Sequence, residues 1–151
     1  MEITSTAFTH DNSIPALYTC DGEGVSPPLT IRGVPESAKS LVLIMEDPDV
    51  SPQVREDRMW DHWIVFNIPP NTTQIPEGVE PEGVHGVGTS GTNAYHGPCP
   101  PDREHRYFFA LYALDTFLDL PEGASKQDVL QAMEGHVIEQ AELVGRYNRQ
   151  K

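Results

Sequence analysis

Prolines and glycines interrupt this chain along its whole length. Its 151 residues include 14 prolines and 12 glycines. Proline removes a backbone donor and glycine raises the entropic cost of order, so interruptions this frequent disfavour long helices. The same residues are typical of turns between short strands. We therefore predict a mainly β protein, and the length predicts one domain spanning residues 1–151.

Three apolar runs have the length and composition of strands. Residues Ser40–Asp47 (SLVLIMED) form a continuous apolar run that ends in acid, which is typical of a buried strand. Residues 62–70 (HWIVFNIPP) alternate between two faces. Residues 105–115 (HRYFFALYALD) are apolar on both faces, which predicts a central strand. His105 and Tyr107 share one face of that strand, because successive side chains alternate.

Only the last part of the chain has a helical pattern. Ser125 followed by Asp128 is a capping signal ahead of an apolar run. Gly135 interrupts the pattern, and apolar residues at helical spacing resume after it. These are Ile138, Ala141 and Val144. The pattern predicts two short helices, or one kinked helix, ending near Gly145.

The charge of the chain excludes one class of function. Ten basic and 23 acidic side chains give a formal net charge of −13. Such a chain repels nucleic-acid phosphates, and no cluster of lysine and arginine offsets this, so we predict no nucleic-acid binding. No apolar stretch is long enough to cross a bilayer, and no secretory signal is visible at the N-terminus. We therefore expect a cytoplasmic protein without integral membrane association.

The chain has two cysteines, Cys20 and Cys99. A reducing cytoplasm predicts that both are free thiols. A disulfide between them is the alternative, because its geometry depends on the fold. No CxxC spacing occurs, so the sequence predicts no structural zinc site.

Polar and aromatic side chains mark three junctions between a loop rich in proline or glycine and a predicted strand. They are Asp47 with Asp49, Trp60 with His62, and His105 with Tyr107. Taken singly, a surface turn and structural histidines explain them. Taken together, junctions of this kind gather at one end of a sheet. An imidazole made cationic by nearby carboxylates, a phenol and backbone N–H groups can hold phosphate. The sequence therefore predicts a pocket for a phosphorylated or zwitterionic head group.

Four segments in a fixed order carry a family resemblance. They are YTCDGEGVSPPLTIRGVPESAKSLVLIMEDPD, MWDHWIVFNIPP, YHGPCPPDREHRYFFALYALD and AMEGHVIEQAELVGRY. In these segments the chain resembles the phosphatidylethanolamine-binding protein family, in its bacterial and archaeal Raf-kinase-inhibitor-like branch. The resemblance implies an antiparallel, Greek-key-like fold of two sheets, short peripheral C-terminal helices and a small anion-binding pocket.

The family motifs also imply which residues bind the ligand. They correspond here to Asp47, Asp49, Trp60, His62, Gly97, Pro98, His105 and Tyr107. The resemblance implies that His62 and His105 face the anion. Two positions depart from the family pattern: Ser51 replaces a proline, and Ala94 replaces a glycine. We expect the first to alter the pocket rim and the second to alter the glycine-rich loop.

These observations favour a binding protein without a cofactor over an enzyme. Its ligand would be a small phosphorylated or zwitterionic molecule, in a pocket of fixed conformation. The resemblance adds a kinase or another signalling protein as a partner, and a homodimer. The alternative is a hydrolase that uses His and Asp as acid and base. Its nucleophile would be Ser51, Ser90 or Cys99, none of which lies in a GxSxG motif.

A metal site is the other alternative for the histidines. His85 and His96 could join His62 or His105 as ligands. No HExxH arrangement supports this, so we predict no metal.

Overall fold

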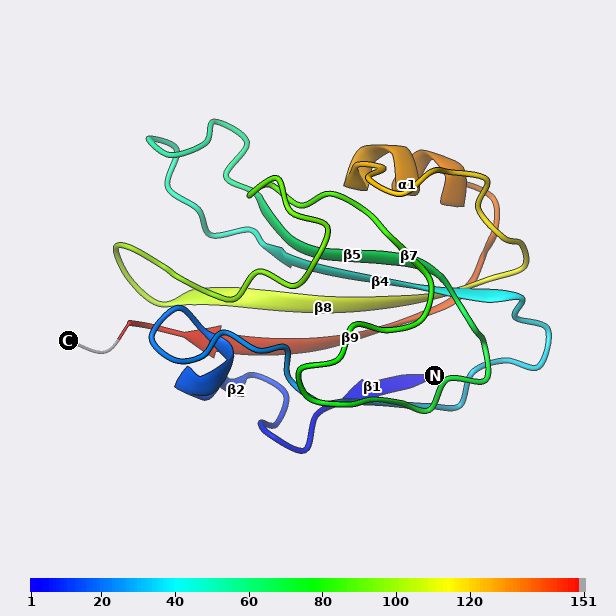
Figure 1. Ribbon diagram of the computed structural model, residues 1–151, viewed down its shortest axis with the longest axis horizontal. Helices are drawn as coiled ribbons and strands as arrows, with labels where there is room; N and C mark the ends of the chain where they lie inside the picture. Colours follow the sequence, from blue (N-terminus) through cyan, green and yellow to red (C-terminus); the bar gives the residue numbers. More distant parts are fainter. Residues whose placement is uncertain (150–151) are drawn as a thin grey trace.

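Two β-sheets and one short helix make up the protein, as described by a computed structural model for residues 1–149 (Figure 1). The large sheet contains, in spatial order, β2 (Asn12–Ser13), β9 (Val137–Tyr147), β8 (His105–Leu114), β4 (Ser40–Asp47), β5 (Trp60–Ile68) and β7 (Val84–His85). The small sheet contains β1 (Glu2–Thr4), β3 (Leu29–Arg32) and β6 (Gln74–Ile75). A 3₁₀ turn covers Ala16–Tyr18, and α1 covers Lys126–Met133. The predicted mainly β, two-sheet fold is confirmed.

Antiparallel pairing dominates, and within residues 1–149 only the short β2 pairs in parallel, with β9. The strand predicted at residues 40–47 has the expected bounds, and the predicted central strand is β8, which lies between β9 and β4. Because β4 runs opposite to both β5 and β8, its C-terminal end lies beside their N-terminal ends. This pairing brings the three polar junctions to one end of the large sheet.

The core lies on both faces of the large sheet. One face packs against the small sheet, and the other packs against α1 (Figure 1). In β4, Leu43 and Met45 belong to the first cluster, while Val42 and Ile44 belong to the second. A strand covered on both faces needs apolar side chains at successive positions, which explains the unbroken apolar run.

The prediction of a second C-terminal helix is wrong. The capping box of Ser125 and Asp128 begins α1 as expected, and Gly135, with a φ of 78°, follows its end. Residues Val137–Tyr147 then form β9, which pairs along the length of β8. The spacing of apolar residues there fits a helix, but pairing with β8 overrides that local preference.

Gly145 lies in β9, at a point where another segment packs closely against this strand. A Cβ at this position would overlap the side chain of Ile14. The missing side chain lets the segment around β2 pack closely against β9.

Among the described residues, no helix is long and apolar enough to span a membrane.

Candidate functional site

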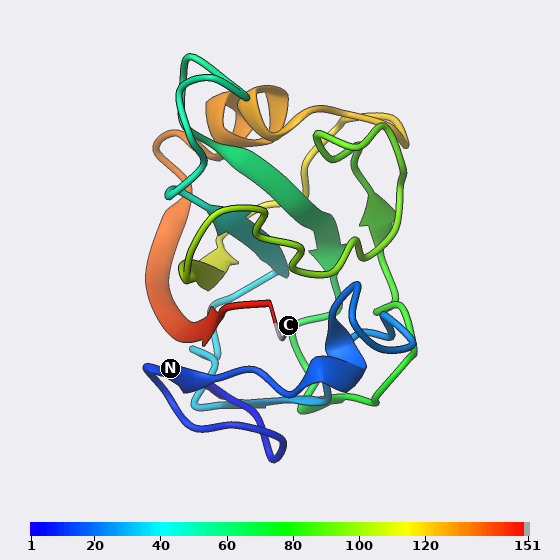
Figure 2. The same ribbon diagram turned by 90° about the vertical axis from the view of Figure 1, so that its left-hand side faces the viewer.

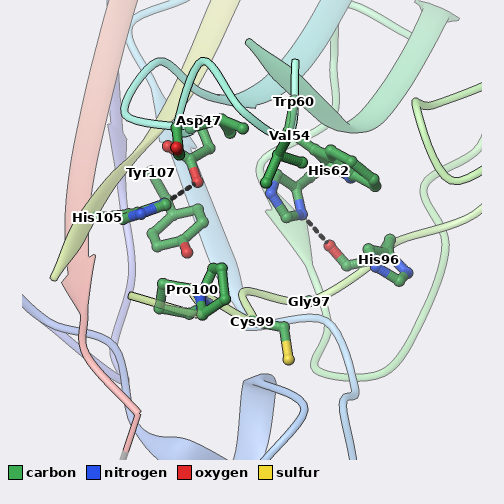
Figure 3. Close-up of a pocket in the computed structure, with 13 residues that line it drawn as sticks. Asp47, Val54, Trp60, His62, His96, Gly97, Cys99, Pro100, His105 and Tyr107 are labelled. Carbon is green, nitrogen blue, oxygen red and sulfur yellow. Dashed lines mark hydrogen bonds and ion pairs between the residues drawn. The ribbon is translucent and has the colours of Figure 1, made fainter. Parts of the chain in front are cut away.

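A cavity of about 290 Å³ opens at the end of the large sheet where β4 finishes and β5 and β8 begin (Figure 3). This is the left-hand end of Figure 1, which faces the viewer in Figure 2. The strands contribute Asp47, Trp60, His62, His105 and Tyr107, and two loops contribute Val50, Ser51, Val54, His96, Gly97, Cys99, Pro100 and Pro101. The predicted convergence of the three junctions is therefore present.

Two of the predicted ligand-binding residues, Asp49 and Pro98, do not line this cavity. Asp49 instead binds Arg106 through both carboxylate oxygens, at 2.8 and 2.9 Å, and accepts the backbone N–H of Arg106 at 2.9 Å. These bonds to Arg106 hold the pKa of Asp49 below its usual range. The backbone N–H of Asp49 donates to Asp47 at 2.8 Å. Asp49 thus fastens the loop after β4 to the start of β8.

The imidazole of His105 lies between two carboxylates. Nδ1 is 2.6 Å from Asp47 Oδ2, and Nε2 is 2.8 Å from Asp102 Oδ1. Asp47 and His105 are only 3% and 2% exposed. Burial raises the pKa of Asp47, against the lowering effect of its bond to His105. The bond from His105 lowers the pKa of the exposed Asp102.

The two hydrogen bonds of His105, to Asp47 and to Asp102, fix the charge of this triad of side chains. Each of its two hydrogen bonds needs one proton, and an ionised carboxylate has none to give. The three side chains Asp47, His105 and Asp102 therefore share two protons and carry one net negative charge. Neither ring nitrogen of His105 is free for a ligand. Asp102 was missed in the sequence, although an acid three residues before the histidine was a usable signal.

His62 differs from His105 in its hydrogen bonding and in its charge. Its Nδ1 is 2.6 Å from the backbone oxygen of His96. A dashed line marks this contact in Figure 3. A carbonyl only accepts, so Nδ1 carries the proton and Nε2 is left as an acceptor. The residue is 4% exposed, and burial lowers the pKa of His62 to about 4. His62 is therefore neutral near pH 7, and the cationic imidazole expected from the sequence is not this one.

Two buried donors in the pocket wall lack a partner. Trp60 Nε1 and Tyr107 Oη make no hydrogen bond within the described residues. Burial raises the pKa of Tyr107, so its hydroxyl keeps the proton. Buried polar groups almost always have a partner, and an unmade bond costs free energy. These two groups are suited to donate to a ligand.

The same architecture occurs in known proteins. The profile of the family described as "Phosphatidylethanolamine-binding protein" matches residues 4–148. The chain belongs to the phosphatidylethanolamine-binding protein family. The family resemblance predicted from four sequence segments is thus confirmed.

Relatives of this family member occur in bacteria and archaea. A UPF0098 protein of Methanothermobacter thermautotrophicus is 54% identical over 155 residues, covering 99% of each chain. The crystal structure of a putative phosphatidylethanolamine-binding protein homologue from Chlamydia trachomatis is 50% identical, with a TM-score of 0.96 over 99% of this chain and 97% of that one. E. coli YbcL is 29% identical, with a TM-score of 0.87 over 99% and 98% of the two chains.

The prediction of free thiols is wrong for this family member. Cys20 and Cys99 form a disulfide, with Cα atoms 5.4 Å apart. The two segments also meet through their backbones: Cys20 N–H donates to Pro98 O at 3.1 Å, and a Cβ at Gly97 would lie 2.5 Å from Tyr18 O. The fold, not the sequence spacing, brings the thiols together. Structural disulfides are typical of oxidising compartments, and the cytoplasmic location stays a prediction.

Two sets of residues singled out in the sequence remain: the candidate metal ligands, and the positions Ser51 and Ala94 that depart from the family pattern. Within residues 1–149, no group of three or more His, Cys, Asp or Glu side chains could hold a metal ion. His85 lies on β7 outside the pocket wall, with Nε2 3.0 Å from Pro81 O. Ser51 lies in the pocket wall, where its hydroxyl contacts Gln53. Ala94 does not line the cavity.

Acid should destabilise this protein through His62. In the unfolded chain a histidine titrates near pH 6.5, whereas in the fold its pKa is about 4. The unfolded state therefore binds the extra proton between these values. The contribution of His62 to the free energy of unfolding is complete above pH 6.5. It falls by about 3 kcal/mol as the pH drops to about 4. Urea unfolding from pH 7 to 4 measures this, and His62→Gln should flatten the profile. An equally steep profile in the variant would contradict the assignment.

Proposed function

We propose that this protein binds a small phosphorylated or zwitterionic molecule in the pocket and does not transform it. The proposal is carried by the two unpartnered donors, Trp60 Nε1 and Tyr107 Oη, in a wall that is otherwise largely apolar. Pockets of this kind, with few polar groups that fix orientation, are typical of small-ligand sites. The cavity of about 290 Å³ suits a head group rather than a lipid with its acyl chains.

Fixed walls support binding without a large rearrangement. The Asp49–Arg106 pair secures the loop that carries Val50, Ser51 and Val54. The Cys20–Cys99 disulfide secures the opposite loop. A preformed site loses less conformational entropy when the ligand binds.

Binding is favoured over hydrolysis by the state of the candidate nucleophiles. Ser51 is hydrogen-bonded to Gln53, Ser90 to Thr92, and Cys99 is in the disulfide. An activated nucleophile needs an adjacent base. Among the described residues, none of the three is hydrogen-bonded to His62 or His105.

Calorimetric titration with phosphoethanolamine tests the proposal. Tyr107→Phe should weaken binding by about 10-fold or more, because a hydrogen bond to a charged group contributes about 1.5–3 kcal/mol. Tyr112→Phe is the matched control, because Tyr112 lies on the same strand but outside this pocket. Absence of binding by the wild type would refute the proposal. Release of inorganic phosphate during the titration would favour the hydrolase instead.

A signalling partner such as a kinase, and a homodimer, remain part of the proposal through the family resemblance alone. Ligand occupancy would then modulate the partner. Analytical ultracentrifugation with and without phosphoethanolamine tests the dimer directly.

A further inference from the structure

The pocket offers a ligand two donors and one acceptor. The donors are Trp60 Nε1 and Tyr107 Oη. The acceptor is His62 Nε2, because the bond to His96 O holds the proton on Nδ1. In Figure 3 the free nitrogen of His62 points away from His96 and toward the side of the pocket that holds Tyr107 and Asp47. A complementary ligand group must therefore accept twice and donate once.

The pocket also lacks a counter-charge for a dianion. None of the described residues that line it is a lysine or arginine. Arg106 is bound to the Asp49 carboxylate, and Arg103 donates to the Asp49 carbonyl at 3.0 Å. The triad around His105 contributes one negative charge at the wall. Like charges at close range repel strongly in a partly buried site, so each extra negative charge on the ligand weakens binding.

We propose that the pocket selects a phosphate monoester that carries one proton, with its P–OH donating to His62 Nε2 and its other oxygens accepting from Tyr107 and Trp60. This inference rests on the proposed function and names the ionic form that the site takes. A single proton lies between the phosphate oxygen and Nε2 in the complex. Phosphodiesters and sulfate esters have no such proton near neutral pH, so they leave Nε2 facing an oxygen lone pair.

The site should therefore respond to pH through its ligand. A phosphate monoester loses its second proton near pH 6. Above that pH, complex formation must take up one proton, and affinity falls as pH rises. The titratable groups around His62 are Asp47 from β4, His105 and Tyr107 from β8, and His96 and Asp102 from the loop before β8.

Calorimetry with phosphoethanolamine between pH 6.5 and 8 tests the inference. The expected Kd rises with pH, approaching about tenfold per pH unit, as one proton is taken up. Titration in two buffers of different ionisation enthalpy measures that uptake. O-sulfoethanolamine and glycerophosphoethanolamine are the proton-free probes. They should bind at least about tenfold more weakly at pH 6.5 and show no such slope.

Two variants assign the effect to one residue. A glutamine amide donates or accepts by rotating, so His62→Gln should reduce the pH dependence to less than about twofold per unit. His85→Gln is the control, because His85 is a histidine on β7 outside the pocket wall. This control should keep the wild-type slope.

The outcomes separate this inference from the proposed function. Phosphoethanolamine binding that is independent of pH, or stronger at pH 8, overturns proton selection and leaves ligand binding intact. Equal affinity for the monoester and the diester also overturns it. No binding at any pH defeats the proposed function itself.

Discussion

Replacing both Cys20 and Cys99 with serine should lower the free energy of unfolding by about 4 kcal/mol. The two cysteines are 79 residues apart, so the bond closes a long loop in the unfolded chain. Removing it restores the conformational entropy of that loop to the unfolded state. Urea denaturation of the oxidised wild type and the double variant, at the same pH and temperature, measures the difference.

Controls distinguish the bond from the packing of the side chains. Cys20→Ser alone and Cys99→Ser alone should each lose about as much as the double variant, because either change removes the whole bond. A reductant should destabilise the wild type and leave the double variant unchanged. Equal stability of the wild type in oxidising and reducing conditions would show that the bond does not contribute.

His105→Leu should destabilise the fold by about 3–5 kcal/mol. Asp47 is 3% exposed, and His105 is its hydrogen-bonding side-chain partner at 2.6 Å. Without that partner, the carboxylate must stay buried and charged or take up a proton, and both carry a cost. Thermal and urea unfolding at pH 7 provide the measurement.

A double-mutant cycle tests the cause. The variant that combines Asp47→Leu with His105→Leu leaves no buried charge, so its loss should be smaller than the sum of the two single losses by about 1–3 kcal/mol. Asp102→Asn is the control at the exposed end of the triad, where solvent screens the ion pair and its contribution to stability is small. Strict additivity in the cycle would rule out the coupling of Asp47 with His105.

The pocket combines features that were visible in the sequence with others that were not. Asp47, Trp60, His62, His105 and Tyr107 could be predicted because each lies at a strand end that a loop motif marks. Their hydrogen bonds could not be predicted. Whether a histidine meets a carboxylate or a carbonyl depends on angstrom-scale positions, and this contact decides which nitrogen carries the proton.

Asp49 illustrates the same difference. The DPD motif predicts two acids on one stiff turn, and both are present there. Their side chains nevertheless diverge: Asp47 lines the cavity, while Asp49 binds Arg106 on β8. Spacing along the chain does not report which of two neighbouring carboxylates meets an arginine from another strand.

By itself, the sequence determined the mainly β character, the central apolar strands, the start of α1 and the family, because apolar periodicity, turn residues and caps act over a few neighbouring positions. Only the tertiary structure decided that Val137–Tyr147 is a strand, that Cys20 meets Cys99, and which groups stay unpartnered in the pocket. Each of these depends on contacts between segments far apart along the chain. Their free energy outweighs local preference only once the sheet has assembled.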